Sequence, residues 1–242
     1  MADPVHVALT HAYPDVTIPQ DGLFIRVNNG LALELRGPPV RSPAERLANA
    51  TIADQFAQTY PLDFDLKARS SPWFDPGRAR NDAFFRALWF ADRQAAEASL
   101  VQVAAPRLGN VIYSVTAKRN VACQLATVLD ALSNAPEDLS YIFASAAGGF
   151  NWRLIAGTDR LSAHSFGIAV DVNAEIGQYW KWTGAPEGRV GAYHNRIPPH
   201  VVQAFERYGF IWGGKWHHFD GMHFEYRPEL ILHARLVEGG RH

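Results

Sequence analysis

The sequence has little cysteine, no long apolar run and no excess of charge of either sign. Cys123 is the only cysteine, which excludes an intrachain disulfide and any metal site built from several thiolates. A metal would therefore need histidine and carboxylate ligands. No apolar run approaches the roughly 20 residues of a membrane span, so we predict no span. The formal net charge is −1 and the basic residues are scattered, which predicts neither nucleic acid nor an anionic membrane surface as a partner.

The start of the chain, MADPVHVALT, lacks the basic and apolar regions of a signal peptide. Two expectations about the compartment stay open. Either the protein is made for the cytoplasm, or this start replaces a signal removed from a periplasmic or secreted protein. We expect a monomer in both cases.

The chain does have enough apolar residues for a full core, since 48% of its 242 residues are hydrophobic. The stretch GLFIRVNNGLALEL predicts a hairpin that turns at Asn29 and Gly30. Ser42 is a candidate N-cap for a helix over 42–60, and a second helix is predicted over 81–100. The residues between these two helices look irregular.

Beyond residue 100, short predicted strands and helices follow one another without a regular βαβ rhythm. Strands are predicted over 110–117, 139–149, 166–173 and 221–228, and helices over 121–132 and 198–209. This pattern favours an α+β fold with a central antiparallel sheet flanked by helices. We expect residues 1–100 to form an N-terminal extension packed on a catalytic domain of residues 101–242.

The stretch SAHSFGIAVDV, residues 162–172, places a histidine seven positions before an aspartate. In a strand the side chains alternate, so Asp171 shares a face with Gly167 and Ala169, whose small size leaves room for a metal or substrate. His164 comes just before the strand and can turn back toward the same place.

A second histidine and aspartate lie in HHFDGMHFEY, where Asp220 precedes His223 by three positions. Alternation points His223 and Glu225 to the same side of the last predicted strand. Two imidazoles and one carboxylate, from His164, Asp171 and His223, are typical of a catalytic zinc site with an open fourth position. Asp220 is then placed to take a proton from water and to return it to a leaving amine.

Other interpretations of these residues stay open. Strand histidines are more often hydrogen-bonded structural residues than ligands. The same ligand types also form the iron(II) triad of non-haem oxygenases, although such triads commonly begin with His and Asp two positions apart, and here the gap is seven. Two carboxylates embedded in apolar strand sequence would be costly if unpaired, which favours the metal.

The two stretches SAHSFGIAVDV and DGMHFE resemble the Ser-x-His-x-x-Gly-x-Ala-x-Asp and Asp/Glu-x-x-His motifs of the zinc D-alanyl-D-alanine carboxypeptidase family. That family includes dipeptidases and phage endolysins that cut between L-Ala and D-Glu. The resemblance covers roughly residues 105–232. It implies that zinc is the cofactor, bound by His164, Asp171 and His223, and that Asp220 is the general base. Many relatives have Glu at the base position, so Asp220 resembles the endolysin-like branch.

The resemblance also implies residues that contact the substrate. The family has an arginine before the first motif that polarises the scissile carbonyl, and Arg153 looks like its counterpart, with Arg160 as the alternative. Ser162 and Trp216 are further candidates for substrate binding. Glu225 is a candidate for orienting His223 from behind.

The expected partners are peptidoglycan stem peptides, and the expected activity is that of a metallopeptidase, foremost a D-Ala-D-Ala carboxypeptidase. An L-Ala–D-Glu endopeptidase and a non-catalytic wall-binding module are the alternatives. With a wall substrate, a periplasmic or secreted location is the prediction, and the cytoplasm stays the alternative.

Overall fold

A computed structural model describes residues 3–38 and 41–240. The chain begins with helix α1 (Pro4–Ala12) and a small sheet of order β1-β2-β3, formed by Val16–Thr17, Phe24–Val27 and Leu33–Glu34. Strands β2 and β3 pair antiparallel, which confirms the predicted hairpin. The turn uses Asn28 and Asn29, with φ of 51° and 57°, instead of Asn29 and Gly30. Asparagine tolerates this left-handed backbone better than most residues.

Each of the two helices predicted before residue 100 is split into two shorter ones. The first begins as predicted at Ser42, whose side chain forms a capping box with Glu45, but α2 (Pro43–Ala48) ends early and a 3₁₀ turn follows at Ala53–Phe56. The second is divided into α3 (Asp82–Leu88) and α4 (Arg93–Glu97). The side chain of Asp92 accepts from the Ala95 amide and so starts a new helix.

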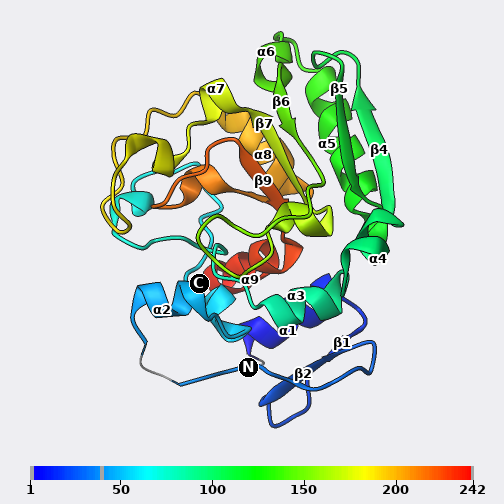
Figure 1. The fold of residues 1–242 in the computed structure, drawn as a ribbon, viewed down its shortest axis with the longest axis vertical. Helices are drawn as coiled ribbons and strands as arrows, with labels where there is room; N and C mark the ends of the chain where they lie inside the picture. The colour runs from blue at the N-terminus through cyan, green and yellow to red at the C-terminus, as the bar shows by residue number, and fades with distance from the viewer. Residues whose placement is uncertain (1–2, 39–40, 241–242) are drawn as a thin grey trace.

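A two-stranded antiparallel sheet lies at one side of the molecule, formed by β4 (Leu100–Ala105) and β5 (Val111–Thr116). The sequence analysis predicted β5 but not β4. The predicted helix after it is confirmed as α5 (Val121–Ser133), which packs against β4 through one apolar face. Figure 1 shows this sheet and α5 standing beside the central sheet.

The central sheet has the order β6-β7-β9-β8 and is antiparallel throughout, which confirms the predicted α+β class. Its strands are β6 (Ala146–Gly148), β7 (Ala169–Asn173), β8 (Phe210–Trp212) and β9 (His223–Tyr226). The strand prediction for 139–149 was wrong in its first half, because Ser140–Phe143 forms the short helix α6. Strand β8 was not predicted.

Strand β7 begins three residues later than predicted, because a 3₁₀ turn over Ala163–Phe166 precedes it. Gly167 ends that turn with a φ of 65°, and a Cβ there would lie 2.9 Å from the backbone nitrogen of Thr116. The small size of Gly167 therefore serves a close backbone approach and a left-handed conformation, not an open site as the sequence analysis predicted.

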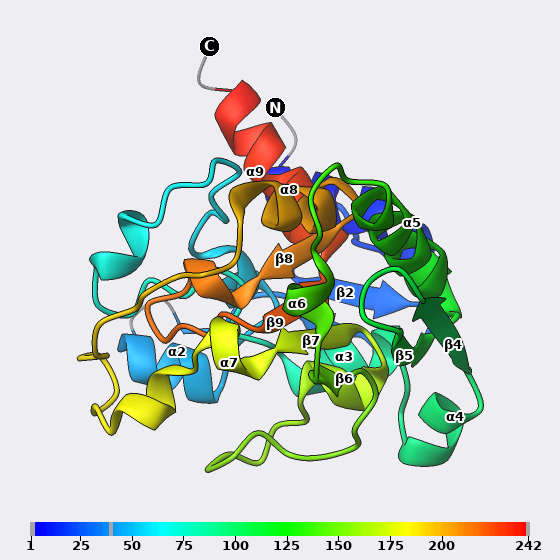
Figure 2. The same cartoon turned by 90° about the horizontal axis from the view of Figure 1, so that it is seen from above.

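Three helices complete the second half. The short α7 (Ala174–Gly177) follows β7, and α8 (Pro199–Arg207) packs on β8, with Gly209 beyond its end at a φ of 92°. Helix α9 (Pro228–Gly239), which the sequence analysis did not foresee, lies against α1 (Figure 1). Figure 2 shows the strands of the central sheet from above, with α8 and α9 together on one side. None of the helices in the described residues is long and apolar enough to cross a membrane.

One hydrophobic core joins the two halves of the chain. Leu9 and Ile25 from the first hundred residues belong to the same buried cluster as Val170 and Phe224 of the central sheet. The irregular segment before α3 also reaches the central sheet's loops, where the Phe74 carbonyl accepts from the His217 amide at 2.7 Å. The boundary at residue 100 remains a prediction, but no separate core marks it in the part of the chain that the structure describes.

Candidate active site

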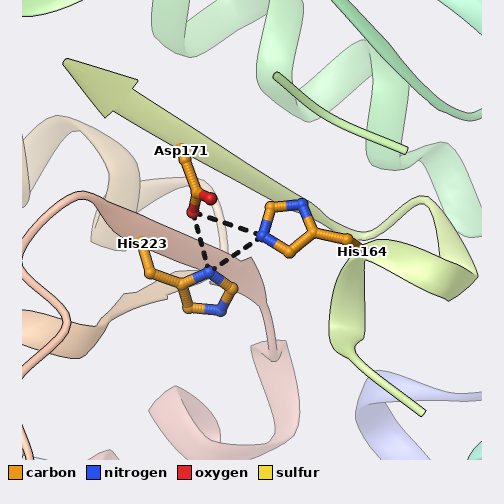
Figure 3. A group of neighbouring side chains, drawn as sticks. All are labelled: His164, Asp171 and His223. Atoms are coloured by element: carbon orange, nitrogen blue, oxygen red, sulfur yellow. Dashed lines mark hydrogen bonds and ion pairs between the residues drawn. The ribbon is translucent and has the colours of Figure 1, made fainter. Parts of the chain in front are cut away.

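Three side chains meet beside the central sheet, and each offers one ligand atom to a common point (Figure 3). His164 Nε2 lies 3.2 Å from His223 Nδ1 and 3.2 Å from Asp171 Oδ1, and His223 Nδ1 lies 3.0 Å from that same oxygen. Two ligand atoms on a tetrahedral zinc with bonds of ~2.0–2.1 Å stand about 3.3 Å apart. The triangle therefore has the size that a metal of this kind requires.

The second nitrogen of each imidazole ring fixes which atom faces the centre. His164 Nδ1 donates to the Gly149 carbonyl at 2.6 Å, and His223 Nε2 donates to Glu225 at 3.1 Å. In the neutral rings, His164 Nε2 and His223 Nδ1 then carry lone pairs, and both point at a carboxylate oxygen. Three electron-rich atoms this close repel one another unless a cation lies between them, so the residues fit a bound metal ion.

The chain brings these groups together through strand register and a turn. Strands β7 and β9 pair so that Asp171 stands opposite His223. The 3₁₀ turn before β7 carries His164, and the Ser162 hydroxyl accepts from the His164 amide at 3.4 Å. Burial by itself raises the pKa of Asp171, but positive charge on the neighbouring His164 and His223, when these rings are protonated, holds it well below its ordinary value.

Charges around His223 favour a positive charge at the centre of the triangle. Burial lowers the pKa of His223, but hydrogen bonds to Asp171 and Glu225 raise it to about 10. A cation is thus stabilised here either as a proton on the ring or as a metal ion between the ligand atoms.

Glu225 lies behind His223 and is completely buried. One of its oxygens accepts from His223 and pairs with Arg80, and the other accepts from Arg227 Nη1 at 2.9 Å. Burial raises the pKa of Glu225, but Arg80, His223 and Arg227 together hold it well below its usual range. Glu225 is therefore an anion that fixes the ring orientation and tautomer of His223.

Asp220 lies beside the metal ligands on the loop before β9. Its amide donates to the Gly213 carbonyl at 3.0 Å, and its carbonyl accepts from the His223 amide at 3.1 Å. Within the described residues, Asp220 Oδ1 is buried without a hydrogen-bond partner. Burial raises the pKa of Asp220 to about 6 despite the nearby His223. A carboxylate with this pKa and a free oxygen can accept a proton near neutral pH.

A pocket of about 280 Å³ opens over the ligand triangle and Asp220. Four arginines line it: Arg78, Arg80, Arg153 and Arg160. Arg153 is exposed, whereas Arg160 is half-buried, and burial together with Arg80 and Arg78 lowers the pKa of Arg160 to about 10. The pocket lining therefore carries four guanidinium groups beside the carboxylates of Asp171 and Asp220.

Ser162 and Trp216 also line this pocket. The ring of Trp216 lies 5.8 Å from that of His223, and its indole N–H donates to the Pro76 carbonyl at 2.7 Å. Ser162 is buried and already bound to the His164 amide. All nine residues singled out in the sequence therefore lie in the pocket or, in the case of Glu225, directly behind it.

The sequence analysis missed pocket residues that come from the first hundred positions and from the loop after α7. Arg78 and Arg80 lie in the stretch SSPWFDPGRAR, and Tyr179 forms an isolated β-bridge with Asp220. His218 also lines the pocket, where its Nδ1 donates to Asp75 at 2.6 Å. The sequence does show two closely spaced arginines beside prolines and aromatic residues. Nothing in it indicates that these arginines contact a site about 140 positions later in the chain.

Two imidazoles and a carboxylate around one point are groups that metal-dependent hydrolases use, and beside them lies a second carboxylate whose Oδ1 has no hydrogen-bond partner among the described residues. Residues 156–226 match the family model described as D-alanyl-D-alanine carboxypeptidase. The match includes the three ligand residues and Asp220, and it confirms the resemblance that the two motifs carry. This segment is therefore similar to a family of metallopeptidases. No curated protein and no solved structure matches the chain.

Proposed function

We propose that this protein is a zinc metallopeptidase that hydrolyses a peptide bond in bacterial peptidoglycan stem peptides, foremost as a D-Ala-D-Ala carboxypeptidase. The observation that carries the proposal is the convergence of His164 Nε2, His223 Nδ1 and Asp171 Oδ1 beside the partnerless carboxylate of Asp220. The family match over residues 156–226 supports the substrate class. A periplasmic or secreted location and a monomeric state belong to the same proposal.

Zinc bound in the triangle supplies Lewis-acid chemistry and lowers the pKa of water to about 7. Asp220, ionised above its pKa of about 6, accepts the proton of the attacking water and later returns it to the leaving amine. Arg153, exposed at the pocket wall, donates to the scissile carbonyl oxygen as negative charge develops on it. Glu225 keeps the Nδ1 lone pair of His223 directed at the centre of the site throughout.

One observation favours the L-Ala–D-Glu endopeptidase as a second candidate. Arg80 and Arg160 line both the pocket and a neighbouring cleft of about 830 Å³, which is lined by residues from the stretches 33–38, 41–51, 80–83 and 157–160. A cleft that adjoins the pocket offers room for a chain that extends past the scissile bond, as an endopeptidase requires.

The test is to incubate the zinc-loaded protein with defined muropeptides ending in D-Ala-D-Ala and to identify the products by mass spectrometry. Loss of one terminal alanine is the expected result, and a cut after L-Ala would favour the second candidate. Asp220→Asn should abolish the product without unfolding the protein. Asp130→Asn, a matched change on the exposed side of α5, should leave the rate unchanged.

Other outcomes would overturn the proposal. Binding to wall sacculi without cleavage in excess zinc would favour a non-catalytic module. Oxygen uptake that depends on iron(II) and an organic acid would favour an oxygenase.

A further inference from the structure

Arg78, from the first half of the chain, lines the pocket, and part of its guanidinium group makes no hydrogen bond in the described residues. Its side chain is 16% exposed, and the Nη1 atom is buried without a hydrogen-bond partner in the part of the chain described. The nearest carboxylate oxygen, Asp75 Oδ2, lies 3.7 Å away, which is too far for a hydrogen bond. Burying a guanidinium N–H without a hydrogen-bond acceptor costs free energy, and an anion bound at this group would remove that cost.

Asp75 forms an ion pair with Arg78 but no hydrogen bond, and His218 holds Asp75 at both of its oxygens. The His218 amide donates to Oδ1 at 2.8 Å, and His218 Nδ1 donates to Oδ2 at 2.6 Å. Arg80, only two residues away, is different, since it pairs directly with Glu225. The two arginines of one segment therefore have separate tasks: Arg80 supports His223 from behind, and Arg78 faces the open pocket.

Arg160 lies in the same pocket and repeats the pattern. Its Nε and Nη1 atoms are buried without partners among residues 3–38 and 41–240. The carboxylates of the pocket are committed elsewhere, because Asp171 belongs to the ligand triangle and Asp220 is the proposed base. Two guanidinium groups of one pocket, each with buried N–H groups that lack a hydrogen-bond partner among the described residues, indicate a site for a negatively charged group of the substrate.

Arg78 stands at the Asp220 end of the pocket. Its guanidinium carbon lies 5.8 Å from the centre of the Trp180 ring, and the preceding residue, Tyr179, pairs with Asp220 through a β-bridge. Arg78 also lowers the pKa of Asp220, as expected of a neighbouring cation. Under the proposed function, Asp220 returns its proton to the leaving amine, so the leaving residue occupies this end.

We propose that Arg78, together with Arg160, binds a free α-carboxylate on the residue that follows the scissile bond. The inference rests on the proposed function. The pocket volume of about 280 Å³ lies just below the ~300–1,000 Å³ of typical ligand sites, so a carboxylate held there lies within about one residue of the bond that is cut. A C-terminal D-Ala has a free α-carboxylate. A D-Glu whose side-chain carboxyl is joined to the next residue also has one, so both substrates offer the same group to Arg78.

The experiment compares each peptide with its carboxamide. One pair ends in D-Ala-D-Ala or in its C-terminal amide, and the other pair carries L-Ala linked to D-Glu with the α-carboxylate free or amidated. Zinc-loaded wild type, Arg78→Gln and Arg78→Lys are assayed for kcat and KM on all four peptides. Arg93→Gln is the matched control, because Arg93 is 65% exposed and pairs only with Glu97 in the described structure.

Wild type should prefer the acid of the pair that it cleaves. Arg78→Gln should raise KM for that acid by about 10- to 100-fold, the effect of losing a hydrogen bond to a charged group, and should leave the amide's KM unchanged. Arg78→Lys should restore part of the preference, since it keeps the charge but not the planar fork. Melting temperatures of the variants show that each is folded.

Two results would overturn the inference while leaving the proposed function intact. One is cleavage by wild type with equal KM for acid and amide. The other is an undiminished acid preference in Arg78→Gln. A wild type that cleaves none of the four peptides would overturn the proposed function and this inference with it. The pair that is cleaved identifies the source of the carboxylate.

Discussion

Glu225→Gln is expected to weaken both the fold and the metal site. Glu225 is completely buried and contacts His223, Arg80 and Arg227, so the change leaves two guanidinium groups facing a neutral amide. Breaking a buried ion pair from one side costs about 3–5 kcal/mol. For a chain of this length each kcal/mol lowers Tm by about 2–4 °C, so Tm should fall by about 6–20 °C. Loss of the group that orients a ligand histidine should weaken zinc binding by about 10- to 100-fold.

The assay measures Tm in excess chelator and the zinc dissociation constant by calorimetry on the same preparations. Chelator separates the ion-pair effect from the metal effect, because the first persists without zinc. Glu97→Gln is the control, since Glu97 is 44% exposed and its pair with Arg93 contributes at most about 0.5 kcal/mol. Equal Tm values and equal zinc affinities for the two variants would refute the assignment of Glu225 as the anion that holds His223.

Three further predictions concern the base, the metal and the oxyanion. Burial raises the pKa of Asp220 to about 6 in the folded protein, whereas in the unfolded chain its pKa is about 4. Folding therefore favours the neutral form of Asp220. The stabilisation that results is fully present below about pH 4 and is lost as the pH rises through 6. Tm measured against pH should show this slope in wild type and lose it in Asp220→Asn. With zinc present at 100-fold over its dissociation constant, adding a chelator should lower the free energy of unfolding by about 2.7 kcal/mol and Tm by about 5–11 °C. If zinc still raised the Tm of Asp171→Asn by this amount, Asp171 would not be a ligand. Arg153→Gln should lower kcat by about 10²–10³-fold with little change in KM, and a change confined to KM would assign Arg153 to ground-state binding.

Local sequence patterns predicted those parts of the site whose geometry is set within one strand or one turn. Strand alternation put His223 and Glu225 on one side of β9, and the structure has them 3.1 Å apart at Nε2 and Oε2. The seven positions from His164 to Asp171 span a turn followed by a strand, and this succession can be predicted from the sequence. The pairing of β7 with β9, in contrast, comes from tertiary packing. Register of that kind has no signature within either strand.

The remaining pocket could not be predicted because it depends on long-range contacts. Arg80 reaches Glu225 across 145 positions, and Arg78 reaches the Asp220 end of the pocket from the same segment. The strand prediction over 139–149 was wrong in its first half for a related reason, since an apolar run with β-branched and aromatic residues fits a buried helix as well as a strand. Tertiary packing decided the choice in favour of α6.

The ion pair between Arg80 and Glu225 limits how this protein can be divided. The segment that matches the family, residues 156–226, contains the proposed ligands and base, yet both cations that pair with its buried Glu225, Arg80 and Arg227, lie outside it. If that segment were cut out and grafted onto another scaffold, Glu225 would lose both of its arginine partners, and His223 would lose the fixed anion that orients its ring. Any transfer of this metal centre to another protein, by natural recombination or by design, therefore has to include the segment that bears Arg80.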